Sequence, residues 1–462
     1  MPTTRLFRHI LSLTLLLILS GFTLKACTQP PKEAMKPITL TWWRVFDDTG
    51  AVQPSIDAFR RDHPTITVNV RRLRFEEYED ELLNALAEDR GPDIISLHNT
   101  WIGKYKSKLT PMPASTTLPY QFLTGTIKKE VMTELRTTPS ISLRRLRENF
   151  LDVVADDVIQ PDFGVSGQPP KEQVFGLPLS VDTLVLYYNR DLLNAAGIPE
   201  AARTWSELQE HVRKLTKLDK EKILQSGIAL GASANIPRST DILSLLMMQN
   251  GAEMADEQGF ATFDRIPPGF TDRNVPPGEE ALSFFTDFAN PTKEVYTWNK
   301  TLPDALEFFA SGRLGYFLGY SYQLPLIRSR APKLKFGITK VPQIESTPEI
   351  NFANYWVESV SKKSTQANAA WAFIQFMTGA DQVRNYLTAA KRPPALRALI
   401  PEFSEDPDLS AFANQLLTTK SWYKGVNAPG AERILGTLID SVASGDAEPL
   451  KALQFSVGQI NQ

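Results

Sequence analysis

The sequence has little of what catalysis by histidine, cysteine or a bound metal would use. It contains one cysteine, Cys27, and four histidines among 462 residues. A single cysteine excludes an internal disulfide, and so few histidines argue against a histidine-based metal site or catalytic triad. The GxSxG, HExxH, P-loop and GxGxxG patterns are absent as well. We therefore expect a protein without catalytic residues, metal or cofactor.

An excess of charge of one sign is also missing. The 50 basic and 52 acidic side chains leave a net charge of −2, which argues against a nucleic-acid partner. Acidic pairs such as Glu76-Glu77 are adjacent in sequence and do not share a helix face, so a glycosidase-type carboxylate pair is disfavoured. Aromatic residues, in contrast, are plentiful: 8 Trp, 12 Tyr and 25 Phe. Most of them will belong to the core, and the surplus can line a ligand cleft.

The N-terminus is typical of a secretory signal. Arg5 and Arg8 precede an apolar run over residues 10–19, which is short for a membrane span, and Ala26-Cys27 follows. Residues 1–27 resemble the signal and lipobox of bacterial lipoproteins, in which Cys27 would be lipidated, although Lys25 stands where that motif prefers a small or uncharged residue. An uncleaved N-terminal anchor is the alternative. Residues 28–37 form a polar tether, and either anchor places the protein at the outer face of the cytoplasmic membrane.

From residue 38 onward, strand patterns alternate with helix patterns. Strands are predicted over residues 38–45, 65–71 and 93–97, and helices over 52–61 and 75–90. This alternation indicates a mostly parallel α/β sheet. Residues 107–175 fit the rhythm poorly, and we interpret them as a helical and loop insertion with helices at 126–135 and 143–154. The chain is predominantly helical from residue 365.

An ordered series of segments resembles one known family. The first is an apolar strand and capped helix over residues 183–197, preceded by FGLPLS at 175–180. A helix end, glycine turn, strand and aromatic pair follow at 308–325, and strand and helix segments at 336–342, 354–364 and 369–377. Together these segments resemble the extracellular solute-binding proteins of ABC importers, of the sugar-type family 1. No single segment is diagnostic, whereas the ordered series is specific.

The resemblance implies a two-lobe, type II periplasmic-binding-protein fold of the α/β class, with three inter-lobe crossings and a helical C-terminal region. The crossings are expected near residues 180–184, 316–320 and 354–357. Lobe I would comprise residues 38–180 plus 320–354, including the insertion, and lobe II residues 184–316 plus 357–462. Ligands bind such folds in the crevice at the carboxyl ends of strands.

The resemblance also implies ligand-binding residues along this crevice. Tyr322 matches the position of a ligand-stacking Trp in the family, and Tyr320 accompanies it; packing within the loop is the alternative for both. Asp182 is a candidate acceptor for paired sugar hydroxyls or a structural hinge carboxylate. Trp356 faces the cleft or the core, and Arg392 the cleft or the solvent. The remaining candidates belong to the first lobe. Trp43 lies on its opening strand, and Phe46, Asp47, Asn99, Thr100 and Trp101 lie on loops; Trp101 covers a ligand ring or anchors its loop.

The implied function is binding of a neutral mono- or oligosaccharide and its delivery to the permease subunits of an ABC importer by lobe closure. We expect a monomer that meets the membrane through its N-terminus. An amino acid ligand would call for a paired acid and base, which Asp182 and Arg392 could supply. The rival classes are a secreted carbohydrate-active enzyme and a module of the same fold that presents ligand to a sensor kinase.

Overall fold

The computed structural model describes residues 36–46, 49–126, 128–162, 169–220 and 222–462. The predicted signal segment, Cys27, most of the predicted tether and Asp47 lie outside these ranges. Among the helices of the described ranges, none has both the length and the apolar character needed to cross a bilayer.

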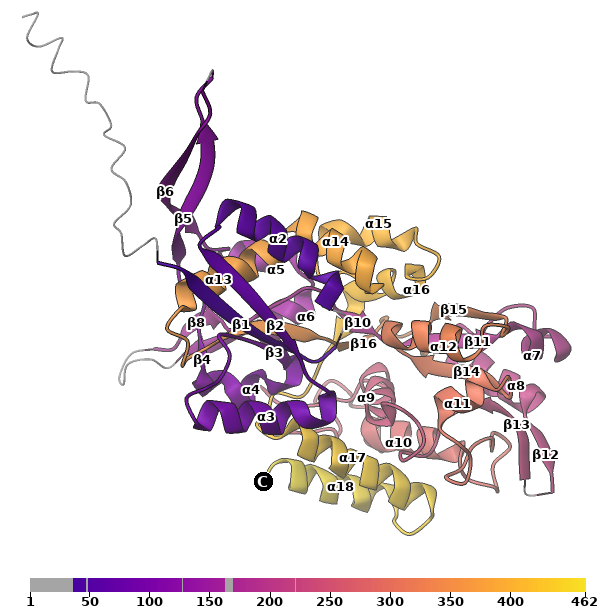
Figure 1. Cartoon of the computed structure of the whole chain (residues 1–462). Coiled ribbons are helices and arrows are strands. Elements are labelled where there is room, and N and C mark those ends of the chain that lie inside the picture. The colour runs from indigo at the N-terminus through magenta and orange to yellow at the C-terminus, as the bar shows by residue number, and fades with distance from the viewer. Residues whose placement is uncertain (1–35, 47–48, 127, 163–168, 221) are drawn as a thin grey trace, which may run out of the picture.

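Two α/β lobes lie side by side, each built on its own sheet, as the sequence predicts (Figure 1). The sheet of the first lobe has the order β2-β1-β3-β17-β4, and β9 also pairs with β17. Strands β1, β2 and β3 are parallel, whereas β17 runs antiparallel to β3. The strands are β1 (Ile38–Arg44), β2 (Ile66–Arg72), β3 (Ile94–His98), β4 (Leu109–Thr110), β9 (Leu177–Pro178) and β17 (Trp356–Ser361).

Alternation along β1 gives its two tryptophans different neighbours. Trp42 packs edge-on against Phe373 with ring centroids 5.6 Å apart, whereas Trp43 lies under the guanidinium of Arg71. Every residue of β3 is buried, as expected for a central strand. The helices of this lobe are α2 (Gln53–Asp62), α3 (Phe75–Ala87), α4 (Ile102–Tyr105), α13 (Ala367–Met377) and α14 (Ala380–Ala390).

The insertion contains β-hairpins as well as helices. The predicted helix at 126–135 is wrong, because residues 130–135 belong to a strand that pairs with the preceding one, from Thr124↔Glu130 to Pro119↔Leu135 within this segment. This cross-strand pairing overrides the local helical spacing. The predicted helix at 143–154 is instead two short helices. The elements are β5 (Ser115–Thr124), β6 (Glu130–Pro139), α5 (Leu143–Asn149), α6 (Asp152–Val158), β7 (Ile159–Asp162) and β8 (Lys171–Val174).

The second lobe is built on a five-stranded sheet of order β12-β13-β14-β11-β15. Its first helix begins as predicted, because the Asn189 side chain accepts the Leu192 N–H, and Gly197 follows it with a φ of 68°. Thr204 caps α8 by accepting the Glu207 N–H. The strands are β11 (Val185–Asn189), β12 (Lys217–Asp219), β13 (Lys222–Ile228), β14 (Leu314–Gly319) and β15 (Phe336–Lys340). The helices are α7 (Arg190–Ala195), α8 (Trp205–Leu215), α9 (Ser239–Gln249), α10 (Pro277–Asp287), α11 (Ala305–Ala310) and α12 (Leu324–Arg330).

The C-terminal region is helical, as predicted. The helices are α15 (Ile400–Ser404), α16 (Ser410–Ala413), α17 (Ala428–Ala443) and α18 (Pro449–Ile460). The last two pack on α10 of the second lobe. Short 3-10 turns occupy η2 (Thr49–Ala51), η3 (Asn99–Trp101), η4 (Lys106–Lys108), η5 (Ser321–Gln323), η6 (Arg397–Leu399) and η7 (Leu416–Thr418).

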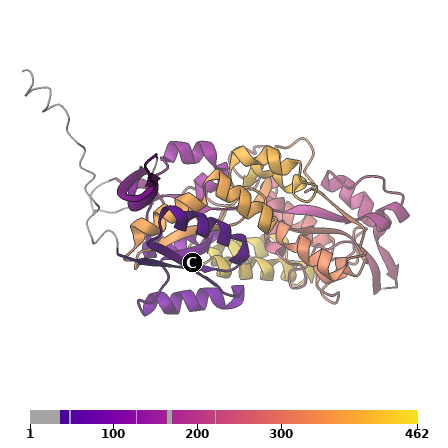
Figure 2. The same ribbon diagram turned by 45° about the horizontal axis from the view of Figure 1, so that its top comes forward.

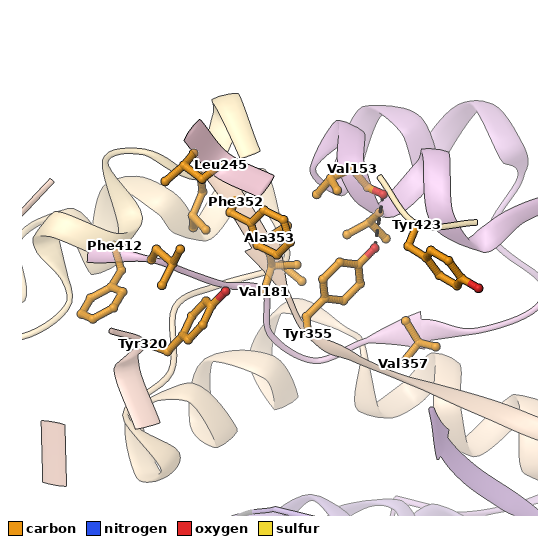
Figure 3. Close-up of a cluster of buried hydrophobic side chains, with 14 of the residues drawn as sticks. Val153, Val181, Leu245, Tyr320, Phe352, Ala353, Tyr355, Val357, Phe412 and Tyr423 are labelled. Atoms are coloured by element: carbon orange, nitrogen blue, oxygen red, sulfur yellow. Dashed lines mark hydrogen bonds between the residues drawn. The ribbon is translucent and has the colours of Figure 1, made fainter. Parts of the chain in front are cut away.

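Three short strands between the lobes form a hinge sheet of order β10-β16-β18. Strand β10 follows β9 of the first sheet and precedes β11 of the second, and β16 links β15 back to β17. Strand β18 leads to α17 and α18. Side chains around this sheet pack into a continuous apolar cluster, which includes Phe352, Ala353 and Tyr355 (Figure 3). The strands are β10 (Asp182–Thr183), β16 (Asn351–Asn354) and β18 (Thr419–Lys420).

The predicted crossing at 316–320 is wrong, and so are the lobe boundaries that depended on it. After Gly319 the chain turns, because the Tyr320 N–H bonds to the Gln323 side chain and Pro325 lies in the first turn of α12. It then returns to the second sheet, where β15 pairs with β11. Residues 356–361, assigned to lobe II from residue 357, form β17 inside the first sheet, and α13 packs on β17. The third crossing instead runs through β18.

Candidate functional site

A cleft between the two lobes opens where β1, β3 and β17 of the first lobe meet the hinge and η5. Its free volume is about 70 Å³ in this structure. Polar, charged and aromatic side chains from both lobes line it: Arg44, Val45, Phe46, Ser96, Leu179, Ser180, Asp182, Tyr322, Asn354, Tyr355, Trp356, Glu358, Tyr386 and Arg392. Ligand pockets commonly have volumes of roughly 300–1,000 Å³. A ligand larger than a few atoms therefore requires the lobes to separate.

An aromatic cluster spans the mouth of this cleft. Phe46, which follows β1, stacks on Tyr322 of the second lobe with ring centroids 6.4 Å apart and an interplanar angle of 6°. The other side of the cluster comes from the first lobe, where Phe75 stacks on Phe46 at 6.0 Å and Trp356 meets Phe46 edge-on at 5.6 Å. Trp101 lies 5.5 Å from Trp356. These rings offer flat apolar surfaces from both lobes.

A buried carboxylate, Glu358, lies at the floor of the cleft and binds several of its neighbours. Glu358 accepts hydrogen bonds from the Trp42 indole N–H and the Ser96 hydroxyl, both at 2.6 Å. The Arg44 guanidinium lies 3.9 Å from the same carboxylate and over the Trp42 and Tyr386 rings. The negative charge is thereby balanced inside the protein.

The second carboxylate of the cleft, Asp182, joins the hinge to the second lobe. It accepts the Ser321 hydroxyl at 2.6 Å and the backbone N–H groups of Ser321 and Thr183. Burial raises the pKa of Asp182, while the nearby Arg392 and the bonds from Ser321 oppose that rise. Arg392 also donates to the Ser321 hydroxyl and lies 5.9 Å from the Tyr322 ring centroid. Burial raises the pKa of Tyr322 to about 12, so this phenol remains a hydrogen-bond donor at neutral pH.

Two further polar networks tie the lobes together, and each includes one residue that also lines the cleft, Asn354 or Tyr355. His98 of β3 lies with its Nε2 3.2 Å from Asn354 Oδ1, and Asn354 donates to Asp241 of α9. Asp241 in turn pairs with Arg238 at 2.7 Å. In the other network, Asp157 of α6 accepts from the side chains of Asn99, Tyr355, Ser421 and Lys424.

The structure brings some of the predicted ligand residues together and separates others. Phe46, Asp182, Tyr322, Trp356 and Arg392 line the cleft, and Trp101 joins its aromatic cluster. Four predicted residues do not line it: Trp43 lies beneath Arg71, Asn99 bonds to Asp157, Thr100 bonds to His98, and Tyr320 is buried and donates to Asp241. Asp47 lies outside the described residues.

The sequence analysis missed other residues of the site, among them Phe75, Arg44, Glu358 and Tyr386. Phe75 opens α3 immediately after β2, and its side chain is 45% exposed beside Phe46. Its position at the carboxyl end of a parallel strand could have indicated it. Arg44 carried a similar signal at the end of β1. Glu358 and Tyr386 carried none, because they reach the cleft through β17 and α14, which the sequence assigned to the other lobe.

A larger cavity of about 730 Å³ lies at the base of the β5–β6 hairpin. Its walls come from α2, α5, α13 and the hairpin, all of which belong to the first lobe. Closure of the two lobes would not change its shape. In the inter-lobe cleft, although it is smaller here, both lobes contribute side chains.

Comparisons with known proteins agree with this fold. The family described as bacterial extracellular solute-binding protein matches residues 46–384. A galactooligosaccharide-binding protein of Bacillus subtilis (strain 168) is 19% identical over 95% of this chain and 94% of its own length. An sn-glycerol-3-phosphate-binding periplasmic protein of Shigella dysenteriae is 25% identical over 62% of this chain and 66% of its own. Among solved structures, the GacH receptor of Streptomyces glaucescens superposes with a TM-score of 0.68 at 17% identity, covering 91% of this chain and 97% of that one.

Proposed function

Because this chain belongs to the bacterial extracellular solute-binding protein family, we propose that it binds a neutral mono- or oligosaccharide in the inter-lobe cleft. The observation that carries the proposal is the pair of parallel rings, Phe46 and Tyr322, which face each other from different lobes. A sugar ring packs its C–H face on an aromatic face. A ring held between these two would contact both lobes at once.

The charges of the cleft favour a neutral ligand over an anionic one. Two arginines line the cavity, and each has a carboxylate beside it: Glu358 near Arg44, and Asp182 near Arg392. An anionic ligand such as a sugar phosphate would have to compete with these carboxylates. A sugar hydroxyl, in contrast, can donate to Asp182 or accept from Arg392 without disturbing the balance. One relative is named as a galactooligosaccharide-binding protein, and the GacH receptor was solved in complex with acarbose.

The mechanism that follows is a shift of population between open and closed forms. The rings of Phe46 and Tyr322 are 6.4 Å apart, whereas a sugar between them needs about 3.5–4.0 Å on each side. The ligand therefore enters an open form and then joins the lobes, and the closed, loaded form docks on the permease of an ABC importer. The N-terminal segment would direct export. Lipid on Cys27, or an uncleaved N-terminal anchor, would then hold the protein beside that permease.

The test is a thermal-shift screen of the purified protein against a saccharide panel, with amino acids and sn-glycerol 3-phosphate as controls. A sugar at 100 times its dissociation constant should stabilise the protein by about 2.7 kcal/mol. The Tyr322→Ala variant should lose most of this shift, and Tyr322→Trp should retain it. A shift with amino acids or glycerol phosphate, and none with sugars, would refute the ligand class. Turnover of the bound sugar would favour a carbohydrate-active enzyme instead. A sensor role would be indicated if the activity of a sensor kinase, and not the import of the sugar, depended on this protein.

A further inference from the structure

The cavity of about 730 Å³ in the first lobe lies apart from the inter-lobe cleft, and we call it the hairpin cavity. It lies between the base of the β5–β6 hairpin and α5, and residues of α2 and α13 complete its walls. Figure 1 shows the hairpin projecting from the lobe beside α2 and α13, and Figure 2 shows it almost end-on. Ligand pockets commonly have volumes of roughly 300–1,000 Å³, so a ligand fits here without any movement of the lobes.

Hydrogen bonds from one helix hold two walls of the hairpin cavity in place. The Asn368 side chain of α13 accepts the Thr117 N–H of the hairpin and donates to the Thr117 carbonyl, at 3.1 and 2.8 Å. Two turns further along the same helix, Gln375 accepts the Ile141 N–H at 3.0 Å, just before α5 begins. The cavity is therefore preformed, and a ligand would not have to order its walls.

The lining side chains come from one face of each neighbouring element. Thr116, Leu118 and Tyr120 recur at every second position of β5, so they point to the same side of the ribbon. On the opposite wall, Arg145 and Asn149 of α5 stand at positions i and i+4 and share one helix face. A ligand in the hairpin cavity would therefore contact a sheet face on one side and a helix face on the other.

Apolar side chains form one part of this lining. Phe376 and Ala372 of α13 and Ile141 before α5 are half-buried and pack against the core of the lobe. They leave an apolar surface that includes an aromatic ring. A sugar ring packs its C–H face on a surface of this kind.

Three polar side chains of the lining have no partner. Within the described part of the chain, Asp62, Arg145 and Asn149 make no hydrogen bond or ion pair through their side chains. A carboxylate accepts hydrogen bonds, a guanidinium donates them, and an amide does both. The two charges have opposite signs, and the remaining cation, Arg136, pairs with Glu134 at 2.9 Å. These groups match a ligand that has donors and acceptors but no net charge.

The hairpin offers a peptide little backbone to pair with beside the cavity. Both backbone groups of Thr117 are bonded to the Asn368 side chain. Pro119 has no N–H, and its carbonyl oxygen lies 2.7 Å from Nδ1 of the His63 ring. A peptide that added a strand to β5 would need these groups. Recognition in the hairpin cavity therefore falls to side chains, and each hydroxyl of a saccharide can both donate to them and accept from them.

We propose that the hairpin cavity is a second ligand site, which binds a neutral oligosaccharide whatever ligand the inter-lobe cleft takes. The C–H face of one sugar ring lies on Phe376, and hydroxyls bond to Asp62, Arg145 and Asn149. Because every wall belongs to the first lobe, occupation of this site does not require the lobes to close. The protein would then hold two saccharides at once, one of them independently of the open and closed forms.

The test uses residues 28–462, which contain the buried core, with Tyr322→Ala added to weaken binding in the cleft. An array of neutral and acidic oligosaccharides supplies the probes, and calorimetry gives the affinity for the neutral array member that binds most tightly. This protein should still bind neutral oligosaccharides. Its radius of gyration in small-angle scattering should not change on binding, because the lobes do not close on this site.

A double variant on α5 and its matched control assign that binding to the hairpin cavity. Arg145→Ala/Asn149→Ala should weaken it on the order of tenfold or more, because two side chains that bond to the ligand are lost. Arg144→Ala/Glu148→Ala removes the neighbouring exposed pair of the same helix, 3.3 Å apart and outside the cavity, and should leave the affinity unchanged. Equal affinity of both double variants and their parent would overturn the proposal.

Ala372→Phe gives a second measurement, because the larger side chain fills part of the cavity from α13. It should abolish binding in the Tyr322→Ala background and leave the affinity of the cleft unchanged when Tyr322 is present. Absence of neutral oligosaccharide binding in the Tyr322→Ala protein, or binding of acidic oligosaccharides alone, would overturn the second site and leave the proposed function of the cleft standing. Conversely, loss of all saccharide binding in Arg145→Ala/Asn149→Ala with Tyr322 intact would refute the cleft and not the hairpin cavity.

Discussion

At the scale of single residues, Glu358 makes several buried interactions at once. It accepts the Trp42 and Ser96 hydrogen bonds and balances the charge of Arg44, whose side chain is 8% exposed. Removing one partner of a buried ion pair leaves the other charge without compensation, which commonly costs 3–5 kcal/mol. The cleft floor is thus also a structural element of the first lobe.

We therefore expect Glu358→Gln to lower the free energy of unfolding by about 3–5 kcal/mol, measured by urea denaturation. The matched control is Glu81→Gln, which breaks the exposed pair with Arg71 at 3.3 Å. That change should cost less than about 1 kcal/mol. Equal losses in the two variants would show that Arg44 does not depend on Glu358.

His98 gives stability a dependence on pH. Burial is the main cause that lowers the pKa of His98, and Arg238 lowers it further, whereas Glu432, Asn354 and Asp241 raise it. Below pH 6.5 the unfolded chain binds a proton at this imidazole that the folded protein does not. Stability is therefore lost as pH falls from about 6.5 towards the lower pKa of the folded state.

For this one group, the slope reaches about 1.4 kcal/mol per pH unit within that window. Burial lowers the pKa values of His63 and His211 too, so these groups also contribute to the pH dependence. The contribution of His98 is therefore measured as the difference between the parent protein and a His98 variant. We expect His98→Gln to have a shallower dependence of the free energy of unfolding between pH 7.5 and pH 5 than the parent protein. Parallel curves would mean that His98 titrates similarly in both states.

At the scale of elements, the sequence was most informative where a local signal and the tertiary structure agree. The cap at Thr204, the left-handed Gly197 and the buried strand β3 carry that information within a few residues. Strand β6 carries no such signal in its own residues, because its strand conformation depends on pairing with β5. The position of β17 was missed for a related reason: a buried strand fits either sheet, and only packing against β3 decides which.

Close approach of elements also explains particular glycines. A Cβ at Gly227 of β13 would lie 2.7 Å from the backbone Cα of Val212 in α8, so this helix could not pack at its present distance. Gly227→Ala should lower the free energy of unfolding by about 1–3 kcal/mol. At Gly436 of α17 the nearest atom would be Ser233 Oγ at 3.5 Å. Gly436→Ala should be neutral or stabilising, because alanine favours a helix interior. Equal effects in urea denaturation would refute the packing argument.

At the scale of the whole molecule, the two-lobe architecture was predictable because many segments in a fixed order specify it. The cleft was only partly predictable. A loop residue after a parallel strand, such as Phe46 after β1, follows a general rule of α/β folds. Asn99 and Tyr320 occupy comparable positions in sequence but turn into the inter-lobe networks, which depend on Asp157 and Asp241 from distant helices.

The same architecture makes Phe46 a contact between lobes as well as a ligand surface. Its stack on Tyr322 favours the closed form even without ligand, by about 0.5–1.5 kcal/mol, which corresponds to a shift of about twofold to tenfold in population. Phe46→Ala should therefore increase the radius of gyration of the ligand-free protein in small-angle scattering, and saturating ligand should reverse the increase.

Phe75→Ala is the matched control, because Phe75 stacks on Phe46 within the first lobe and is equally exposed, at 45%. It should weaken ligand binding without changing the ligand-free radius. If both variants leave that radius unchanged, the aromatic pair does not set the balance between open and closed forms.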